Sequence, residues 1–515
     1  MTTSVSSEET SLLVAEPLKD LAEQRTPERN VFRIRHTLAS RFAFLVICVA
    51  IVLTALAYGT VHYWALALFN LGGLTILLLW VLDAWRLGNL RVSSNVLQLP
   101  LLGALGLGLF QLLPLRAVAP SGATTAGLAN SLSLDPYSTR LVLVQLATLL
   151  IYFAATLVFV DTPHRLRLLV RTIMIFGFGL AIFGLTQSFT SPNKVYWVRE
   201  LAQSTAFGPF INRHHFAGYM ELTIALPLGL LFSGVVDKER RILYLFIAGL
   251  MGVALVMTTS RGGIISLVAE IMFLVVVTTI WRKQDEQHHR HKQDEHRHRH
   301  RPKTSRLRGA ALRIGLATAL LVGLFLGVIL LGGEFSINRF IDSVNTDDPT
   351  TGRAHFWSVT LEIIKAHPYV GTGLGAFGVI YTKYDTRNGL FRLEQAHNDY
   401  LQVLSDGGII GAVLALSFVV LLFYLALMRA RSKDDFRRGV ALAGLSGCFA
   451  VLVHSFFDFT LHTTSNALLF LVMAAIATLD GRVEEAPRSR RKRRSSSSQQ
   501  DGSEGSSIVP LRDKS

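Results

Sequence analysis

Cysteine is scarce in this chain, and so is charge. The 515 residues include two cysteines and only 17% charged residues, while 50% are hydrophobic. Cys48 and Cys448 both lie inside apolar runs near opposite ends of the chain, so neither a structural disulfide nor a cysteine metal cluster is expected. An ordinary soluble domain of this size does not have a positive mean hydropathy. The composition therefore predicts a membrane protein.

The net charge of +15 does not indicate a nucleic-acid-binding protein. The basic residues lie in short segments between apolar runs and at both ends of the chain, not on one soluble face. They have the distribution of topology signals. We therefore expect membrane lipids, and no nucleic acid, among the partners.

Apolar runs long enough to cross a bilayer dominate the sequence. They lie near 43–60, 64–83, 97–115, 139–160, 169–188, 215–236, 242–259, 263–281, 309–332, 408–428, 439–458 and 464–480. The predicted fold class is all-α, a polytopic membrane helix bundle of about twelve transmembrane helices. Because that number is even, both termini are expected on the same side of the membrane.

The basic loops predict which side is cytoplasmic. Placing the N-terminus inside puts most of the 51 Lys and Arg residues in the cytoplasm, as the positive-inside rule expects. We therefore predict a multi-pass protein of the bacterial inner membrane with both termini cytoplasmic. Its predicted segments are a cytoplasmic N-terminal segment at 1–42, helices one to nine at 43–332, a periplasmic loop module at 333–407, helices ten to twelve at 408–480, and a basic tail at 481–515.

Two low-complexity segments are predicted to carry no chemistry. The His-rich cytoplasmic loop 282–308 superficially looks like a metal-ligand cluster, but its mixed charges and lack of defined spacing favour a solvated loop. No metal is expected there. The tail 481–515 is predicted to be disordered, and its basic residues could touch anionic lipid headgroups.

The predicted periplasmic module, between the ninth and tenth helices, carries two helix patterns. The first helix is expected to follow Thr350-Thr351-Gly352, with an apolar face from Arg353 to Ile364, and to end at His367-Pro368. A glycine-rich tight turn at Gly371–Gly375 follows. The second helix is expected from about Glu394, through His397, to a stop at Gly407-Gly408.

Arginines on the predicted outer side are candidate site residues. Arg213 and Arg261 each stand where a connection meets a span, and Arg353 faces the same compartment. A single arginine at such a place is typical of a snorkelling anchor, while the alternative is a fixed cation for phosphate oxygens. Three of them on the outer side oppose the positive-inside trend, which favours the functional alternative.

Histidine and carboxylate side chains supply the other candidates. His397 is the best general base, because imidazole titrates near neutral pH, although a capping histidine is the alternative. His454 and Asp458 lie four residues apart and are expected on one helix face, where a structural hydrogen bond is favoured over catalysis. Glu270, deep in a predicted span, is placed like the coupling group of a transporter.

Several motifs follow one another in a recognisable order. The first is Asn-Arg-His-His-Phe-Ala-Gly-Tyr at 212–219, and the second is Ser-Arg-Gly at 260–262. Arg353 and Trp357 come next, followed by His367-Pro-Tyr-Val-Gly-Thr-Gly. The last two are His397-Asn-Asp-Tyr-Leu and Gly407-Gly-Ile-Ile-Gly. Together they resemble the O-antigen ligase and polysaccharide polymerase superfamily, and residues 454–462 are similar to a tail motif of its exopolysaccharide branch. The resemblance covers about 200–470. The N-terminal helices match only in character, and the His-rich loop and basic tail differ.

The resemblance implies a metal-independent glycosyltransferase without cofactors. It would move a glycan from a polyprenyl diphosphate carrier on the periplasmic face to an acceptor hydroxyl, with inversion at the anomeric carbon. His397 would deprotonate the acceptor, and Arg213 and Arg261 would hold the diphosphate. The further substrate contacts that it suggests are Arg353, Asn212, His215, Asn398 and Tyr400.

The acceptor remains open at this point. A ligase would use lipid A core or protein, and a polymerase would use another carrier-linked glycan. A sensory protein that signals through its tail is a third hypothesis; truncation before Arg488 would silence such a protein but should have little effect on an enzyme.

A lipid-linked sugar transporter or flippase is the main alternative to an enzyme. It would be expected to carry internal repeats and polar groups near the bilayer midplane. No clear repeat is found, and the notable polar residues other than Glu270 cluster at one face.

Two substitutions separate these hypotheses. A transporter predicts that Glu270→Gln abolishes activity while His397→Ala leaves it intact, because only Glu270 lies where coupling occurs. An enzyme predicts the opposite pattern. Gel analysis of surface glycans in cells complemented with each variant distinguishes the two.

Overall fold

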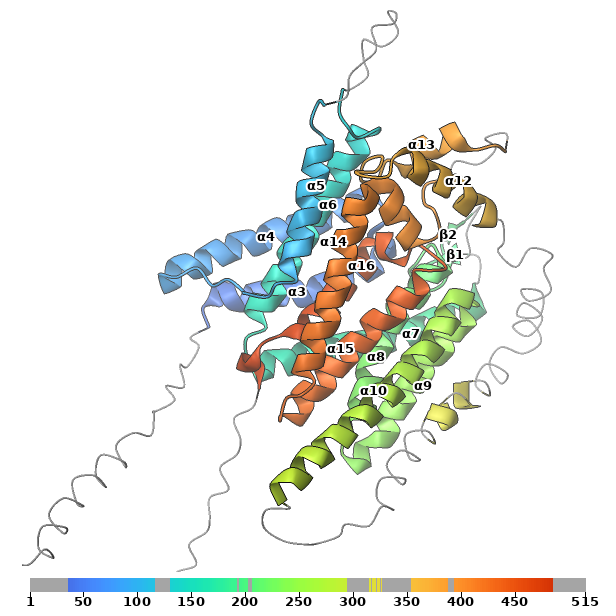
Figure 1. Cartoon of the computed structure of the whole chain (residues 1–515). Coiled ribbons are helices and arrows are strands. Elements are labelled where there is room, and N and C mark those ends of the chain that lie inside the picture. Colours follow the sequence, from blue (N-terminus) through green and yellow to red (C-terminus); the bar gives the residue numbers. More distant parts are fainter. Residues whose placement is uncertain are drawn as a thin grey trace, which may run out of the picture.

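The computed structural model describes residues 36–115, 130–191, 194–201, 206–293, 353–387 and 393–484, and most residues between 315 and 326. These residues are mostly helical, and one hairpin, β1 (Lys194–Val195) with β2 (Arg199–Glu200), accompanies the helices (Figure 1). The predictions for the basic tail beyond 484, for most of the His-rich loop and for 333–352 fall outside the described residues.

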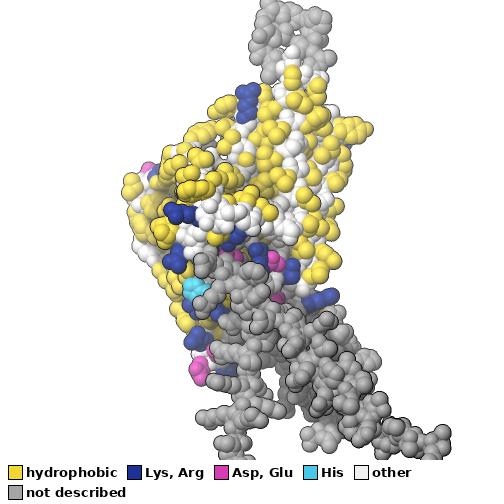
Figure 2. Space-filling model, turned by 90° about the vertical axis from the view of Figure 1, so that its left-hand side faces the viewer, with side chains coloured by type: hydrophobic (Ala, Val, Ile, Leu, Met, Phe, Trp, Pro, Cys, Tyr) yellow, Lys and Arg dark blue, Asp and Glu magenta, His cyan; other side chains and the backbone are white. Residues whose placement is uncertain are grey.

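Nine helices of the described part are long and apolar enough to cross a membrane. They are α3 (Leu38–Leu56), α4 (Tyr63–Leu87), α6 (Pro136–Phe159), α7 (Pro163–Thr190), α8 (Arg213–Ser233), α9 (Arg241–Met257, with the short turn η2, Lys238–Arg240, before it), α10 (Arg261–Gln293), α14 (Asp399–Arg429) and α15 (Asp435–His454). The chain is therefore a multi-pass membrane protein. Figure 2 shows the hydrophobic side chains spread over one face, with most of the visible charged side chains in its lower part.

Two further apolar helices, α5 (Gln98–Gln111) and α16 (Thr464–Thr478), are shorter than a full span. Both coincide with predicted runs. The predicted run near 309–332 lies largely outside the described residues, so the number of twelve crossings stays a prediction.

Helix α8 is the centre of the bundle, and 94% of its most apolar stretch of 18 residues is buried. Small residues let α15 approach it closely: a Cβ on Gly229 would lie 2.6 Å from the Cα of Ala443, and one on Gly447 would lie 2.9 Å from the Cβ of Ala225. Helices inside a membrane associate through such close packing, because lipid supplies no hydrophobic drive between them. The buried position of α8 fixes where its first residues, Arg213 to His215, emerge.

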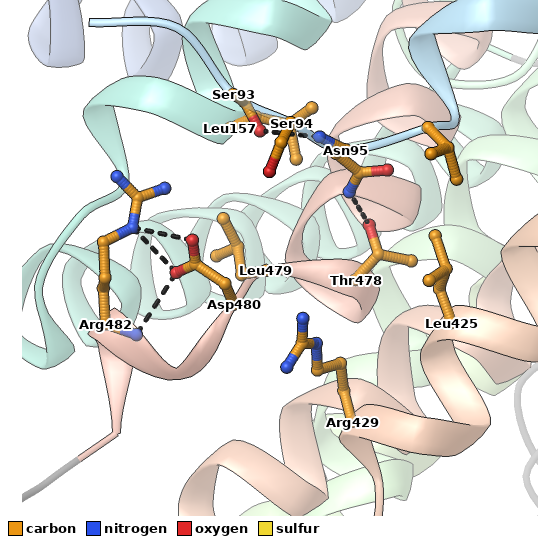
Figure 3. Close-up of a pocket in the computed structure, with 11 residues that line it drawn as sticks. Ser93, Ser94, Asn95, Leu157, Leu425, Arg429, Thr478, Leu479, Asp480 and Arg482 are labelled. Carbon is orange, nitrogen blue, oxygen red and sulfur yellow. Dashed lines mark hydrogen bonds and ion pairs between the residues drawn. The ribbon is translucent and has the colours of Figure 1, made fainter.

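Buried charges hold the end of the bundle where α8 and α14 finish. Arg91 donates to Asp83 (2.7 Å) and to Asp161 (2.9 Å). Arg437, fully buried in α15, donates to the carbonyls of Ile476, Ala477 and Leu479 at the end of α16. A small pocket lies here, where Asn95 donates to Thr478 and Arg482 pairs with Asp480 (Figure 3).

The segment 353–387 contains α12 (Arg353–Ala366) and α13 (Phe377–Tyr384), which pack on each other through buried Val359, Ile363, Phe377 and Ile380. The prediction of a helix from Arg353 that ends before Pro368 is confirmed. The tight glycine turn is confirmed too: Gly371, Gly373 and Gly375 all have positive φ. A side chain at Gly371 would collide with the backbone carbonyl of Asp406, because a Cβ there would lie only 2.4 Å from that oxygen.

The prediction of a second helix from about Glu394 to a stop at Gly407-Gly408 is wrong at its start, whereas the predicted stop coincides with a break in the helix at Gly408. Helix α14 begins at Asp399, since Asn398 caps it by accepting from the N–H groups of Tyr400 and Leu401. At Gly408 (φ 60°, ψ −159°) the helix kinks and then continues to Arg429. At this kink the backbone N–H of Ile409 donates to Pro368 O (2.8 Å), so this backbone donor is paired outside the helix.

The expected helical pair of His454 and Asp458 is also corrected. Helix α15 ends at His454, so Asp458 lies beyond it, in the connection to α16. Only the backbone joins the two residues, through Asp458 N–H to His454 O (3.1 Å).

Arg437→Leu should lower the free energy of unfolding by about 3 kcal/mol, because it leaves the carbonyls at the end of α16 without their charged donor. The neighbouring Arg438→Leu is the matched control: Arg438 pairs with exposed Asp435, and such surface pairs contribute about 0–1 kcal/mol. Thermal unfolding in detergent measures both. Equal losses for the two variants would contradict the anchoring role of Arg437.

Candidate functional site

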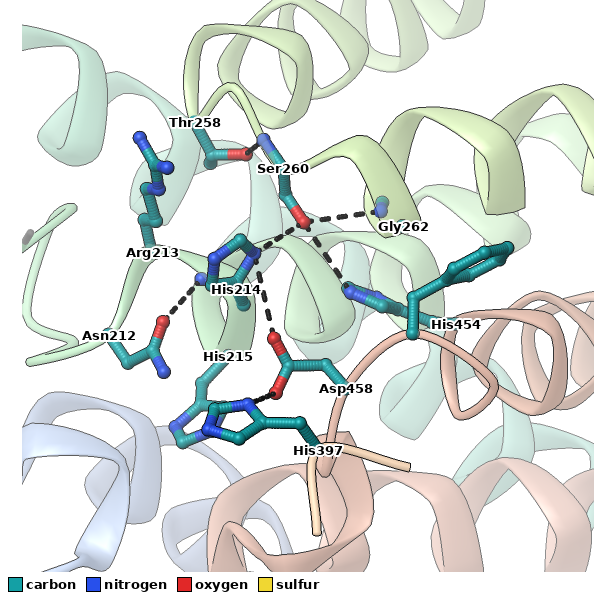
Figure 4. Close-up of polar contacts among 12 residues, drawn as sticks. Asn212, Arg213, His214, His215, Thr258, Ser260, Gly262, His397, His454 and Asp458 are labelled. Atoms are coloured by element: carbon teal, nitrogen blue, oxygen red, sulfur yellow. Dashed lines mark hydrogen bonds and ion pairs between the residues drawn. The ribbon is translucent and has the colours of Figure 1, made fainter. Parts of the chain in front are cut away.

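Asp458 is the hub of a polar cluster where α8, α10, α12 and α14 begin and α15 ends (Figure 4). Its side chain is 1% exposed. The Oδ1 atom accepts from His397 Nδ1 (3.2 Å) and from the N–H of Phe459 (2.9 Å). The Oδ2 atom accepts from Arg353 Nη2 (3.4 Å) and lies 3.7 Å from His214 Nδ1.

These contacts decide the protonation state of Asp458. Burial alone would raise the pKa of the carboxyl, but the hydrogen bond from His397 and the charges of His214 and Arg353 hold its pKa well below the usual range. Asp458 is therefore ionised at neutral pH. It is the acceptor for the Nδ1–H of His397, which leaves Nε2 as the proton-accepting nitrogen.

The backbone and two aromatic rings fix His397 in place. Its φ of 51° lies in the left-handed region, which a side chain other than glycine rarely adopts. The imidazole stacks on Phe356 (6.0 Å between centroids) and meets Phe459 edge-on (4.8 Å). This strained turn, not a helix, presents the ring to the site.

A second branch of hydrogen bonds runs from Asp458 into the bundle. His214 Nδ1 lies 2.8 Å from Ser260 Oγ, which is 3.5 Å from His454 Nε2. His454 Nδ1 then reaches Glu221 Oε1 at 2.7 Å, and both of these side chains are buried. These polar contacts connect α8, the residue before α10, and the end of α15.

Arg353 and His397, which the sequence singles out on separate segments, meet at Asp458, and Arg213 contacts the turn that precedes Arg261. Arg213 Nη1 donates to Thr259 Oγ1 (2.7 Å), two residues before Arg261, which begins α10. Arg353 and His397 both bind Asp458. Arg353 also donates to the carbonyl of Phe457 (2.5 Å), which fixes its guanidinium against the turn after α15.

The other predicted contact residues divide into two groups. Asn212 caps α8, Asn398 caps α14 and donates to Phe456 O (3.1 Å), and the Tyr400 hydroxyl donates to Leu452 O (2.7 Å). These three use their side chains to hold backbone turns. His215 differs, because its ring packs on Phe459 (4.9 Å) and its buried Nε2 meets no partner among the described residues.

Sequence reasoning missed the central role of Asp458 and passed over Ser260 and Glu221. Glu221 could have been found by the rule that singles out Glu270, since each is an ionisable group inside an apolar run. The sequence marks Asp458 only as an expected partner of His454, because the partners that the structure gives it come from three distant segments.

His214, His454 and Asp458 also offer donor atoms that lie within 4.8 Å of one another, the number and kind of donors that a metal site uses. Their nitrogens face Ser260, however, and the guanidinium of Arg353 already stands 3.4 Å from Asp458. A cation there would compete with an existing positive charge, so the cluster suits an internal hydrogen-bond network better.

Asp458→Asn should lower the free energy of unfolding at pH 7 by about 3 kcal/mol, because it removes a buried charge that several half-buried partners share. The folded-state pKa of Asp458 is depressed, so the contribution of its carboxylate is complete at neutral pH and is lost as the pH falls below about 4. The difference in thermal midpoint between variant and wild type should therefore narrow below that pH. Exposed Asp435→Asn is the control, and a gap that persists in acid would contradict the assignment.

Comparison with known proteins bears on this geometry. Residues 246–416 match the family model described as O-antigen ligase. The match includes Ser260, Arg261, Arg353 and His397, whereas Arg213 and Asp458 lie outside it. No curated protein matches the chain. The chain therefore carries an O-antigen ligase-like domain over residues 246–416, which confirms the superfamily that the order of its motifs predicts.

Proposed function

We propose that this chain is a glycosyltransferase of the periplasmic face that moves a glycan from a polyprenyl diphosphate carrier to an acceptor hydroxyl. The observation that carries the proposal is the Asp458–His397 pair, which Arg353 joins at the end of the membrane bundle where Arg213 and Arg261 begin α8 and α10. A base beside fixed cations is what such a transfer needs, and the O-antigen ligase domain supports the same class of reaction.

His397 serves as the general base in this proposal. Asp458 holds the Nδ1–H, so the Nε2 lone pair accepts the proton of the acceptor hydroxyl. The oxygen forms a bond to the anomeric carbon from the face opposite the diphosphate. The bond from that carbon to the diphosphate oxygen breaks, and the diphosphate leaves with the electron pair. The configuration therefore inverts, and a product that keeps the donor's anomeric configuration would contradict the mechanism.

The arginines balance the charge of the leaving diphosphate. Arg213 and Arg261 are the first residues of α8 and α10, so their guanidiniums adjoin two helix N-termini, each of which carries a partial positive charge. Guanidinium groups bind phosphate oxygens in a bidentate manner and thereby orient them. Arg353 adds a third positive charge beside Asp458.

The nature of the acceptor divides the proposal into two forms. A ligase would pass finished glycan to lipid A core or protein, and a polymerase would pass it to another carrier-linked glycan. Both forms use the same chemistry at His397.

One observation favours the transporter alternative. Glu270 is fully buried in α10; Ser446 donates to it (3.4 Å), and its Oε2 has no partner among the described residues. A transporter would use such a group for coupling. A transporter has no use for the contacts of Asp458 with Arg353 and His397, so we favour the enzyme over the transporter.

Glycan analysis tests the proposal. Cells that lack this chain should accumulate carrier-linked glycan and lose the surface product, and His397→Ala should fail to restore it because removal of a general base costs about 100-fold or more in rate. His355→Ala is the matched control: His355 pairs with Asp385 (2.8 Å) at the same end of the protein and should restore transfer.

The accumulated species separates the two forms. Long carrier-linked polymer would indicate a ligase, and single carrier-linked repeats would indicate a polymerase. Unchanged glycans, or full rescue by His397→Ala, would refute the glycosyltransferase proposal.

A further inference from the structure

A cavity of about 520 Å³ lies beside His397. Its walls come from the turn before α4, from α6, from the start of α8, from the segment that leads to α14, and from the turn between α15 and α16. Its size is within the range of small-molecule sites, roughly 300–1,000 Å³. Phe459, which contacts both His215 and His397, contributes an aromatic ring to the wall.

The lining contains buried polar atoms that meet no partner among the described residues. They are Nε2 of His215, Oγ1 of Thr463 and Oε1 of Gln395. His215 is 7% exposed and Thr463 is 2% exposed, so bulk water does not solvate them freely. An unsatisfied buried polar group costs about 1–3 kcal/mol. Three of them in one wall indicate an occupant that carries several hydrogen-bonding groups.

The composition of the lining does not favour a diphosphate as that occupant. No Lys or Arg is among the described residues that line the cavity, and these are the side chains that bind phosphate oxygens most strongly. His462, the remaining basic group apart from His215 and His397, is already paired with Asp399 (2.8 Å). A neutral ligand rich in hydroxyls fits these walls.

Arg213 lies on the other side of Asp458 from His215 and His397. In Figure 4, Arg213 stands above the His214 and Asp458 contact, whereas His215 and His397 stand below it. His397 thus lies between Arg213 and a polar cavity that has no Lys or Arg in its described lining, and it borders the cavity directly. A hydroxyl held in the cavity would lie against the imidazole while the diphosphate lay among the arginines.

We propose that this cavity binds the terminal sugar of the acceptor glycan, whose hydroxyls pair with His215, Gln395 and Thr463. One of its hydroxyls then faces His397 and becomes the nucleophile. This assignment rests on the proposed glycosyltransferase function and adds to it the place where the acceptor binds.

Thr463→Val and Gln395→Met test the assignment by kinetics. Each removes a hydrogen-bonding group at nearly constant volume. The Thr463 hydroxyl does not cap α16 and has no hydrogen-bond partner among the described residues, so Thr463→Val removes no hydrogen bond within this part of the fold. With the purified full-length chain, each variant should raise the acceptor concentration needed for half-maximal transfer by about 5–30-fold. The KM for carrier-linked donor should change less than about twofold. Thr75→Val, on the exposed face of α4, is the matched control.

A labelling experiment measures binding of the glycan in the absence of catalysis. Replacing Cys48 and Cys448, the only two cysteines, with alanine allows a single Thr463→Cys to be modified by a small thiol reagent. The first probe is the acceptor glycan: the oligosaccharide released by mild acid from the carrier lipid if single carrier-linked repeats accumulate, or the core oligosaccharide released from lipid A if long carrier-linked polymer accumulates. The second probe is farnesyl diphosphate. The oligosaccharide should slow modification and farnesyl diphosphate should not.

The outcomes separate this inference from the proposed function. Protection by farnesyl diphosphate alone, or by neither probe, would overturn the acceptor site, as would a rise confined to the donor KM. If cells without the chain accumulate no carrier-linked glycan, the proposed function fails and the acceptor site fails with it. If glycan accumulates and His397→Ala is inactive, but Thr463→Val behaves like Thr75→Val, only the acceptor site is wrong.

Discussion

The buried carboxylate of Asp458 is the interaction on which the site depends. An ionised carboxylate that is 1% exposed in a membrane protein is costly unless several donors satisfy it. Here the donors come from α12, from the turn before α14 and from the adjoining backbone. One charge therefore ties together three segments that are far apart in the sequence, and it sets the tautomer of His397.

The bundle creates the conditions for this site at one end. Four helices, α8, α10, α12 and α14, begin around Asp458, and their N-terminal partial charges add to those of the arginines. At the other end the buried pairs of Arg91 and the carbonyl contacts of Arg437 hold the bundle together. Anion chemistry is thus favoured at one end and structural pairing at the other.

The close approach of α8 and α15 governs the depth of the polar network. Because glycine and alanine residues lie at the closest contacts between these two helices, Glu221 and His454 come within 2.7 Å of each other inside the bundle. Ser260 and His214 extend the contacts to Asp458. A looser pair of helices would leave Glu221 and His454 without partners, so packing and polar satisfaction depend on each other.

The sequence by itself determined the membrane class, the position of most apolar helices, the helix from Arg353 and the glycine turn, because hydropathy, periodicity and turn chemistry are local properties. It also singled out Arg213, Arg261, Arg353 and His397, since ionisable groups beside spans are costly wherever they occur. Only the tertiary structure decided that His397 lies in a strained turn, that Asp458 leaves the helix of His454, and that Asp458 is the common partner. Those facts depend on contacts between residues up to 244 positions apart, such as Asp458 and His214, and no local pattern encodes such a contact.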